Sequence, residues 1–324
     1  MTARRVAVIG GGSSCEHEVS LASAAGVASA LESAGHEVTR LTIARDGGWL
    51  DDHGERIGLE GAVVRLRDSD VVLPIVHGPL GEDGALAALC ELVGVPYAGC
   101  PPTAGAVAMD KWLTKLVAQA VGVATAPGVL VRRGEQVVWP GPCVVKPVCA
   151  GSSHGVSLVA EEAGLADALA AAFALDDRVL VEEVVRGQEV DVAVLDLTHG
   201  DRYVPPLLEI VTDGIFDLVE KYDGSADFRI PARLTTTQEE QVRAAALAVY
   251  DALGCRGLAR VDFFVTATGP VLNEVNTMPG MTPHSQVPRM LAAGGLPYAD
   301  ALDILMDVAL RAREGGQWQR MPQT

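Results

Sequence analysis

Lysine is scarce in this sequence. Among the 25 lysine and arginine residues, the only lysines are Lys111, Lys115, Lys146 and Lys221. An ammonium group is a compact point charge on a flexible stem, and the planar guanidinium of arginine does not replace it at a phosphate oxygen. We therefore regard these lysines as candidates for contacts with the phosphates of a nucleotide. Chance retention is the alternative, and it is strongest for Lys115, which lies one helical turn after Lys111.

Long apolar runs and an export signal are also missing. No stretch of about 18 apolar residues is present, so we expect no membrane span. The N-terminal residues lead directly into a predicted strand instead of a signal peptide. The formal net charge of −17 disfavours nucleic acids and anionic membranes as partners. The six cysteines form no CxxC pair and no zinc-binding spacing, so we expect reduced thiols in a cytoplasmic protein.

Two common nucleotide-binding motifs are absent. The chain has no G-x-x-x-x-G-K-[ST] phosphate loop. The segment VAVIGGGSS looks like a dinucleotide fingerprint, but Cys15 stands at its third glycine position and no acidic residue ends the next strand, which disfavours a dehydrogenase. The same loop carries Glu16 and Glu18. Carboxylates at this edge of a sheet suit an ammonium group better than a pyrophosphate; alternatively, one of the two caps the following helix.

The order of predicted elements indicates an α/β protein with three units. Residues 1–100 alternate strands and helices, which predicts a Rossmann-like parallel sheet. Two further units of mixed strands and helices follow at 101–186 and 187–324. The predicted strands are 5–10, 37–43, 71–75, 128–131, 143–147, 156–159 and 179–183, and the predicted helices are 20–34, 84–93, 103–121, 162–174, 238–253 and 299–313.

The stretch from 259 to 281 is the most informative part of the sequence. It is typical of two short strands joined by a turn at 267–270. Side chains alternate along a strand, so Arg260 and Asp262 share one face, and Glu274 and Asn276 share another. If the hairpin closes, two carboxylates and an amide oxygen lie beside a guanidinium, a set that suits Mg²⁺ bound through phosphate oxygens. The alternative is a surface hairpin whose polar residues face water.

Glycine-rich loops follow several predicted strands. HGPLGEDG at 77–84 indicates tight turns near a ligand or, alternatively, the entry to a helix. Lys146 precedes the loop at 148–155, whose Gly151, Ser152 and Ser153 can present backbone N–H groups to phosphates. The predicted strand at 179–183 has a terminal carboxylate, which can bind an adenine amino group or ribose hydroxyls.

Together these segments resemble one family. GGGSSCEHEVSLASA, HGPLGEDG, AMDKWLTK, VVKPVCAGSSHGVS, VLVEEVVRGQEVDVAVL, EKY, GCRGLARVDFF and LNEVNTMPGMT occur in the order and spacing of D-alanine–D-alanine ligases, within the ATP-grasp superfamily. The resemblance implies an ATP-grasp fold of three α+β domains, with ATP between the central and C-terminal ones. It implies ATP-dependent ligation of two D-alanines through an acyl phosphate, for peptidoglycan precursor synthesis, by a cytoplasmic homodimer.

The resemblance also implies roles for individual residues. Two Mg²⁺ ions, or Mn²⁺ in their place, would be held on the ATP phosphates by Asp262, Glu274 and Asn276. ATP would be contacted by Lys111, Lys146, Ser153, Glu182, Glu183, Glu189 and Lys221. The amino-acid substrates would be bound by Glu16, Val19, His77, Arg260, Gly280 and Ser285. Arg260 and the Gly280 N–H would face the developing oxyanion, and the site would be closed by a hydrogen-bonded set of Glu16, Ser152 and Tyr222.

Some positions depart from the family pattern. Leu218 and Val219 stand where tyrosine and glutamate are common, and the glycine loop carries Cys149, Ala150 and His154 in place of more usual residues. These departures leave open an ATP-grasp paralogue that joins a different amino-acid pair. A nucleotide-binding module without catalysis is a further alternative, which the intact metal-binding set disfavours.

Overall fold

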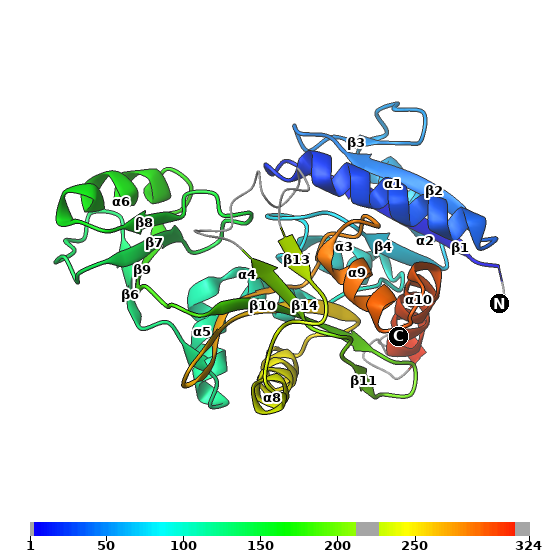
Figure 1. The fold of residues 1–324 in the computed structure, drawn as a ribbon. Helices are drawn as coiled ribbons and strands as arrows, with labels where there is room; N and C mark the ends of the chain where they lie inside the picture. Colours follow the sequence, from blue (N-terminus) through cyan, green and yellow to red (C-terminus); the bar gives the residue numbers. More distant parts are fainter. Residues whose placement is uncertain (1–2, 212–226, 315–324) are drawn as a thin grey trace, which may run out of the picture.

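The computed structural model describes residues 3–211 and 227–314, and the described strands form three sheets (Figure 1). The first sheet has the order β3-β2-β1-β4, with β1, β2 and β4 parallel and β3 antiparallel at one edge. Its elements are β1 (Arg5–Gly11), α1 (His17–Ser33), β2 (Glu37–Ile43), β3 (Trp49–Leu50), α2 (Gly58–Arg67), β4 (Val71–Pro74) and α3 (Ala85–Val93). The predicted parallel sheet is confirmed, although the sequence did not indicate β3 or α2.

The second sheet is small and antiparallel, with the order β6-β9-β7-β8. The elements of this part are β6 (Gly128–Arg132), β7 (Cys143–Pro147), β8 (Ser157–Val159), η1 (Glu162–Gly164), α6 (Leu165–Phe173) and β9 (Arg178–Glu183). Buried valines of the strands pack against α6 in a core of their own. The strands therefore carry Lys146 and Glu182 on a rigid support.

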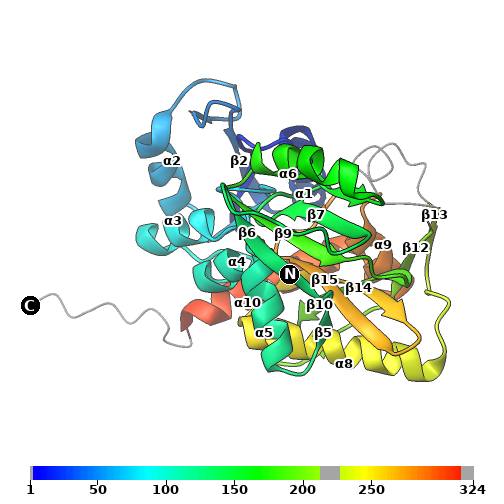
Figure 2. The ribbon, with the colours of Figure 1, turned by 90° about the vertical axis from the view of Figure 1, so that its left-hand side faces the viewer.

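The third sheet has the order β13-β12-β10-β14-β15-β5, and β11 pairs with β10. Its strands are β5 (Ala124–Thr125), β10 (Gln188–Asp196), β11 (Arg202–Tyr203), β12 (Leu208–Val211), β13 (Asp227–Arg229), β14 (Leu258–Thr266) and β15 (Gly269–Asn276). Helix α8 (Thr236–Leu253) covers the face turned away from the small sheet (Figure 2). The opposite face is thus available to a ligand lying between the two sheets.

The helix predicted over 103–121 is wrong as a single element. The chain forms α4 (Pro102–Met109) and α5 (Lys111–Ala120), because Asp110 takes an extended conformation with φ −85° and ψ 99°. The Asp110 carboxylate accepts a hydrogen bond from the Leu113 N–H at 2.9 Å and so caps α5. This cap places Lys111 at the first turn of α5, beside the glycine loop.

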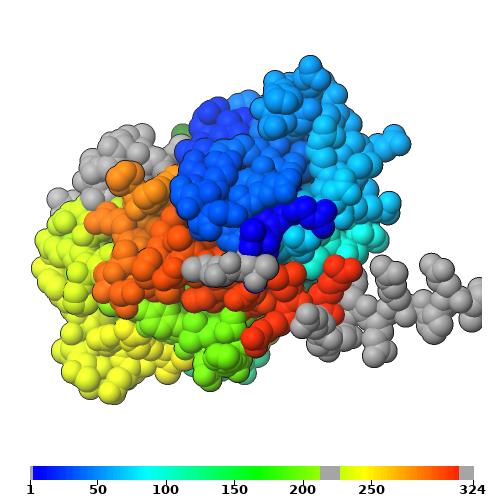
Figure 3. Space-filling view, turned by 90° about the vertical axis from the view of Figure 1, so that its right-hand side faces the viewer, coloured from blue at the N-terminus to red at the C-terminus, as the bar shows by residue number. Residues whose placement is uncertain are grey.

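The N-terminal unit rests on the last two helices, α9 (Gln286–Ala293) and α10 (Tyr298–Glu314), as Figure 3 shows. One apolar core runs from β1, β4 and α1 to β10, α9 and α10. At its edge Arg4 contacts Asp307 at 2.5 Å and His36 contacts Asp303 at 3.1 Å. The loops that follow β1 and β4 are therefore held near the loop that follows β15.

Candidate active site

The hairpin of β14 and β15 closes in the predicted register. Arg260 lies opposite Asn276, and Asp262 lies opposite Glu274. The Asn276 Nδ2 donates to Asp262 Oδ2 at 3.0 Å. The four side chains line cavities instead of an open surface, so the alternative of a solvent-facing hairpin is wrong.

Arg260 is buried among carboxylates. Its Nε and Nη2 donate to Asp262 at 2.8 and 2.7 Å, and its Nη1 donates to Gln286 at 2.7 Å. Asp191, opposite Asp262 on β10, lies 3.5 Å from Nε. Burial opposes the charge, but Asp262 and Asp191 outweigh it and raise the pKa of Arg260 well above its usual value. The guanidinium is therefore a permanent cation at a fixed place.

Glu16 and Ser152 meet across the cavity from two different units. The Ser152 hydroxyl donates a short hydrogen bond to Glu16 Oε1, and both side chains are buried. Glu16 is the residue that precedes α1, but its side chain makes no capping bond, and the exposed Glu18 pairs with Arg45. The proposed helix cap is therefore wrong for both glutamates. A Cβ at Gly151 would lie 2.8 Å from Glu16 Oε2, so glycine allows this close approach.

His77 and Glu82 tie the loop after β4 to the loop after β15. His77 Nδ1 lies 2.8 Å from the Met278 carbonyl, and the Gly78 N–H donates to Glu82 Oε1 at 2.9 Å. Burial lowers the pKa of His77, so the imidazole is neutral at pH 7 and its Nδ1 donates to the carbonyl. Burial, and then the charge of Glu16, raise the pKa of Glu82 to about 8.

The loop after β15 brings Gly280 and Ser285 together. A Cβ at Gly280 would lie 2.9 Å from the Ser285 hydroxyl. That hydroxyl accepts from the Thr282 N–H at 3.1 Å and lies 2.7 Å from the Thr282 hydroxyl. Helix α9 begins directly after Ser285, and the start of a helix favours a bound carboxylate.

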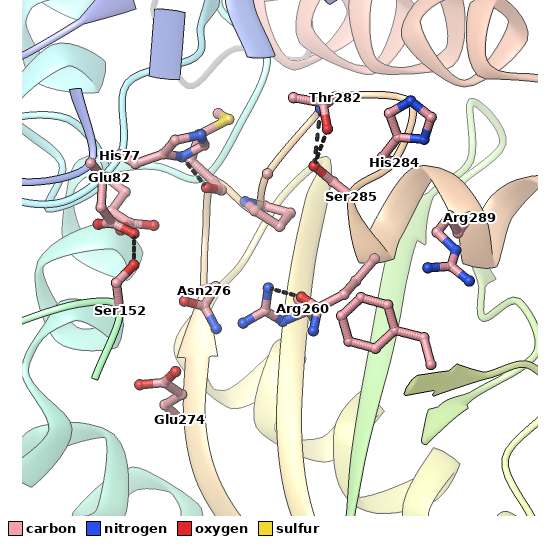
Figure 4. A pocket seen from close by; sticks show the side chains of 16 residues that line it. His77, Glu82, Ser152, Arg260, Glu274, Asn276, Thr282, His284, Ser285 and Arg289 are labelled. Carbon is pink, nitrogen blue, oxygen red and sulfur yellow. Dashed lines mark hydrogen bonds between the residues drawn. The ribbon is translucent and has the colours of Figure 1, made fainter. Parts of the chain in front are cut away.

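A first cavity of about 350 Å³ collects these groups (Figure 4). Its polar lining residues come from all three units: Glu16, His77, Glu82, Ser152, Arg260, Glu274, Asn276, Thr282, His284, Ser285, Gln286 and Arg289. It offers carboxylates for an ammonium group and Arg260 for a carboxylate. An ammonium group and a carboxylate are the two charged ends of an amino acid.

A second cavity of about 820 Å³ lies between the small and the large sheet. The residues predicted to contact ATP that line it are Lys111, Lys146, Ser153, Glu182, Glu183 and Glu189. Lys146 Nζ lies 2.8 Å from Glu182, and Lys111 Nζ lies 3.5 Å from Glu274. Lys111 and Lys146 thus flank the larger cavity, and their contact with nucleotide phosphates stays a prediction.

Some residues named in the sequence analysis are not found at either cavity among the described residues. Lys221, Tyr222, Leu218 and Val219 lie outside the described residues. Val19 is half-buried on α1 and does not line either cavity. Gly280, Asp262 and the other predicted residues named above are all brought to one of the two cavities.

Sequence reasoning missed several residues of this region and gave too little weight to Lys115. Glu82 and Gln286 line the first cavity, and Asp191 flanks Arg260. Lys115, read as the best candidate for chance retention, forms a buried ion pair with Glu182. The acidic pair after the glycines of HGPLGEDG was a usable signal for Glu82, whereas the other contacts depend on the packing of distant segments.

The oxygen donors of Asp262, Glu274 and Asn276 fit a hard cation such as Mg²⁺. Because the Asn276 Nδ2 already donates to Asp262, its amide oxygen is the atom left for a cation. Within 3–211 and 227–314, no group of three or more His, Cys, Asp or Glu side chains could hold a metal ion. Over the same ranges, no helix combines the length and apolar character that crossing a bilayer requires.

Two sequence families match the chain. The one described as D-ala D-ala ligase C-terminus matches residues 130–307, and the one described as D-ala D-ala ligase N-terminus matches residues 5–66 and 54–100. The chain belongs to the D-alanine–D-alanine ligase family. The resemblance drawn from the sequence motifs is thereby confirmed.

Relatives along the whole chain agree with this assignment. The D-alanine–D-alanine ligase of Nocardia farcinica is 40% identical to this family member, over 96% of this chain and 98% of the relative. The crystal structure of VanG D-Ala:D-Ser ligase from Enterococcus faecalis is 33% identical with a TM-score of 0.80, over 95% and 100% of the two chains. The D-alanine–D-alanine ligase from Bacillus anthracis complexed with ATP is 28% identical with a TM-score of 0.81, over 97% and 99%. The predicted ATP-grasp fold is confirmed, and the chain is an enzyme of the ligase class.

Proposed function

We propose that this protein uses ATP to join two D-alanines into D-alanyl-D-alanine, a peptidoglycan precursor. The observation that carries the proposal is the junction of the two cavities, because Arg260, Glu274 and Gln286 line both. One cavity has the size and lysines for a nucleotide, and the other has paired charges for amino acids. A phosphoryl group passing between them crosses at Arg260 and Glu274.

On the nucleotide side, Lys111, Lys146 and Lys221 contact the phosphates. Glu182, Glu183 and Glu189 bind the adenine and ribose, and the backbone near Ser153 closes over the phosphates. Asp262, Glu274 and Asn276 hold two Mg²⁺ ions, or Mn²⁺ in their place. When bound, these ions neutralise charge on the transferring phosphoryl group.

On the amino-acid side, Glu16 takes the ammonium group of the first D-alanine, and His77 lies near the carboxylate of that D-alanine. A carboxylate oxygen of this first D-alanine attacks the γ-phosphorus of ATP. ADP leaves, and the acyl phosphate of D-alanine forms. Activation is required because a carboxylate is a poor electrophile for amide formation.

The second D-alanine lies with its carboxylate at Ser285. Its free amine attacks the carbonyl carbon of the acyl phosphate, and the amine proton and the phosphate leave. Arg260 and the Gly280 N–H stabilise the oxyanion that forms, an interaction worth about 3–4 kcal/mol per donor. The hydrogen-bonded set of Glu16, Ser152 and Tyr222 closes the site against water, which would hydrolyse the acyl phosphate.

We further propose that the protein works in the cytoplasm as a homodimer, with an N-terminal domain at 1–100, a central domain at 101–186 and a C-terminal domain at 187–324. The nucleotide then lies between the last two domains. Neither nucleic acid nor membrane enters this reaction.

The test is phosphate release from ATP with Mg²⁺, measured against a panel of D- and L-amino acids and D-lactate, with the products identified by mass spectrometry. D-alanine alone should give the fastest release and D-alanyl-D-alanine as the product. The likeness to a D-Ala:D-Ser ligase makes D-serine the important competitor in the second position. A mixed product that dominates when D-alanine is present would favour the paralogue that joins a different pair.

A further inference from the structure

Lys115 contacts the nucleotide site from behind. It does not line the larger cavity, whereas Lys146, Glu182 and Ala126 do. Its Nζ donates a short hydrogen bond to Glu182 Oε1 and a second one, of 2.5 Å, to the Ala126 carbonyl. Lys115 therefore does not face a phosphate bound in the larger cavity, although it contacts Glu182 and Ala126, which line that cavity.

Glu182 is shared between two lysines. Its Oε2 lies 2.8 Å from Lys146 Nζ, and its Oε1 binds Lys115. Lys146 lies two residues after Val144, the cross-strand partner of Glu182, so both charges share one face of the small sheet. Burial favours the neutral carboxyl, but Lys146 and Lys115 outweigh it and lower the pKa of Glu182.

The three side chains are almost fully enclosed, with 4% of Lys115, 6% of Lys146 and 4% of Glu182 exposed. An enclosed carboxylate that loses its last partner is strongly destabilised. Lys146 is the partner that faces the cavity, and a phosphate there competes with Glu182 for it. If Lys146 were the only cation beside Glu182, each binding event would leave this buried carboxylate without a positive partner.

We propose that Lys115 is a positioning residue of the nucleotide site: it holds Glu182 in place so that Lys146 can move from Glu182 to the nucleotide phosphates. This inference rests on the proposed function in naming ATP as the ligand. A purely structural role, in which Lys115 only anchors α5 to the small sheet, is the competing explanation. The two differ in whether the effect of Lys115 depends on the charge of Glu182.

The experiment compares Lys115→Met, Glu182→Gln and the double variant in the full-length protein. The affinity for ATP with Mg²⁺ is measured by titration calorimetry without amino acid, so no turnover occurs. Gln119→Ala is the matched control, because Gln119 lies one turn further along α5 and ties it to Thr125 at 2.8 Å without touching Glu182. The KM for D-alanine and the unfolding temperature are measured alongside.

We expect Lys115→Met to weaken ATP binding about tenfold or more, since Lys146 must then stay with Glu182. In the Glu182→Gln background the same substitution should change ATP affinity less than about threefold. The ATP affinity of Gln119→Ala should stay near the wild-type value. The KM for D-alanine should stay near the wild-type value in the Lys115→Met variant. If Lys115→Met does not fold, the double variant should fold, because it buries no unpaired carboxylate.

Three results would overturn the inference. The first is an equal loss of ATP affinity from Lys115→Met in both backgrounds, and the second is a loss under twofold in the wild-type background. The third is failure of the double variant to fold. A wild-type protein that binds no ATP would remove both this inference and the proposed function, whereas one that binds ATP but ligates no D-alanine would remove only the proposed function.

Discussion

Ser152 donates its hydroxyl hydrogen to the Glu16 carboxylate, across 136 positions of sequence. Glu16 belongs to the loop after the first strand of the N-terminal sheet, and Ser152 belongs to the glycine loop of the small sheet. The bond therefore joins the loop after β1 in the N-terminal unit to the glycine loop of the small sheet. Gly151 makes it possible, because any larger residue would collide with the Glu16 carboxylate.

Removing this hydrogen bond should change the kinetic constants for D-alanine more than those for ATP. A hydrogen bond to a charged group contributes about 1.5–3 kcal/mol, so Ser152→Ala should lower kcat/KM for D-alanine about tenfold to hundredfold. The KM for ATP should change much less. The control is Ser69→Ala, which deletes another buried serine hydroxyl far from both cavities. Equal losses for ATP and D-alanine would show that Ser152 shapes the loop instead of orienting Glu16.

Glu274 should be the most sensitive of the three residues proposed to hold the metal ions. It lies opposite Asp262 and 3.5 Å from Lys111, so Glu274→Gln removes a charge at the junction of the two cavities. We expect nearly complete loss of ligation with an unfolding temperature close to the wild type, measured by steady-state kinetics and calorimetry. Retention of more than about a tenth of the turnover at saturating Mg²⁺ would refute the two-metal assignment.

Lys146→Arg tests whether the scarce lysines are placed by chemistry. Arginine keeps the charge but has a different shape and reach, and it would have to fit between Glu182 and the cavity. The KM for ATP should rise strongly, with little change in the unfolding temperature. Arg67→Lys, an exchange at an exposed position of the N-terminal unit, serves as the control and should change neither value. An unchanged KM for the Lys146 variant would mean that this lysine is a chance survivor.

The pH dependence of stability should report on Glu82. The pKa of Glu82 is about 8 in the folded protein and ordinary in the unfolded chain, so the folded state retains a proton that the unfolded state has lost. The stabilisation is fully present below the unfolded pKa and is lost as the pH rises toward 8. Glu82→Gln cannot ionise, so its unfolding temperature should fall less than that of the wild type between pH 5 and 9.

The measurement for Glu82 is thermal unfolding without nucleotide or metal. Glu240→Gln, at an exposed position on the long helix under the large sheet, should retain the wild-type pH profile. Parallel profiles for wild type and Glu82→Gln would show that Glu82 is already ionised at neutral pH in the folded protein.

The hairpin of β14 and β15 was predictable from sequence because its information is local. β-branched strands, a short turn and side-chain alternation together place Arg260, Asp262, Glu274 and Asn276 on one face. The second strand begins at Gly269, inside the turn predicted at 267–270. That difference leaves the functional register unchanged.

Contacts between distant segments were not predictable in the same way. No periodicity links Lys115 to Glu182, which lies 67 residues later, and the pair forms because the fold brings α5 close to β9 at this point. The pairing of Glu16 with Ser152 came from the family resemblance and not from spacing. The break at Asp110 had a local signal, an aspartate before a helical run, but the continuous apolar pattern on both sides concealed it.

The central claim is that a D-alanine carboxylate becomes an acyl phosphate at the junction of the two cavities. The direct measurement uses D-alanine labelled with ¹⁸O in both carboxylate oxygens, with ATP and Mg²⁺, and mass spectrometry of the released phosphate. Since the phosphate leaves with the oxygen that attacked the γ-phosphorus, one ¹⁸O atom should appear in phosphate for each dipeptide formed. Dipeptide formation with unlabelled phosphate would contradict the account.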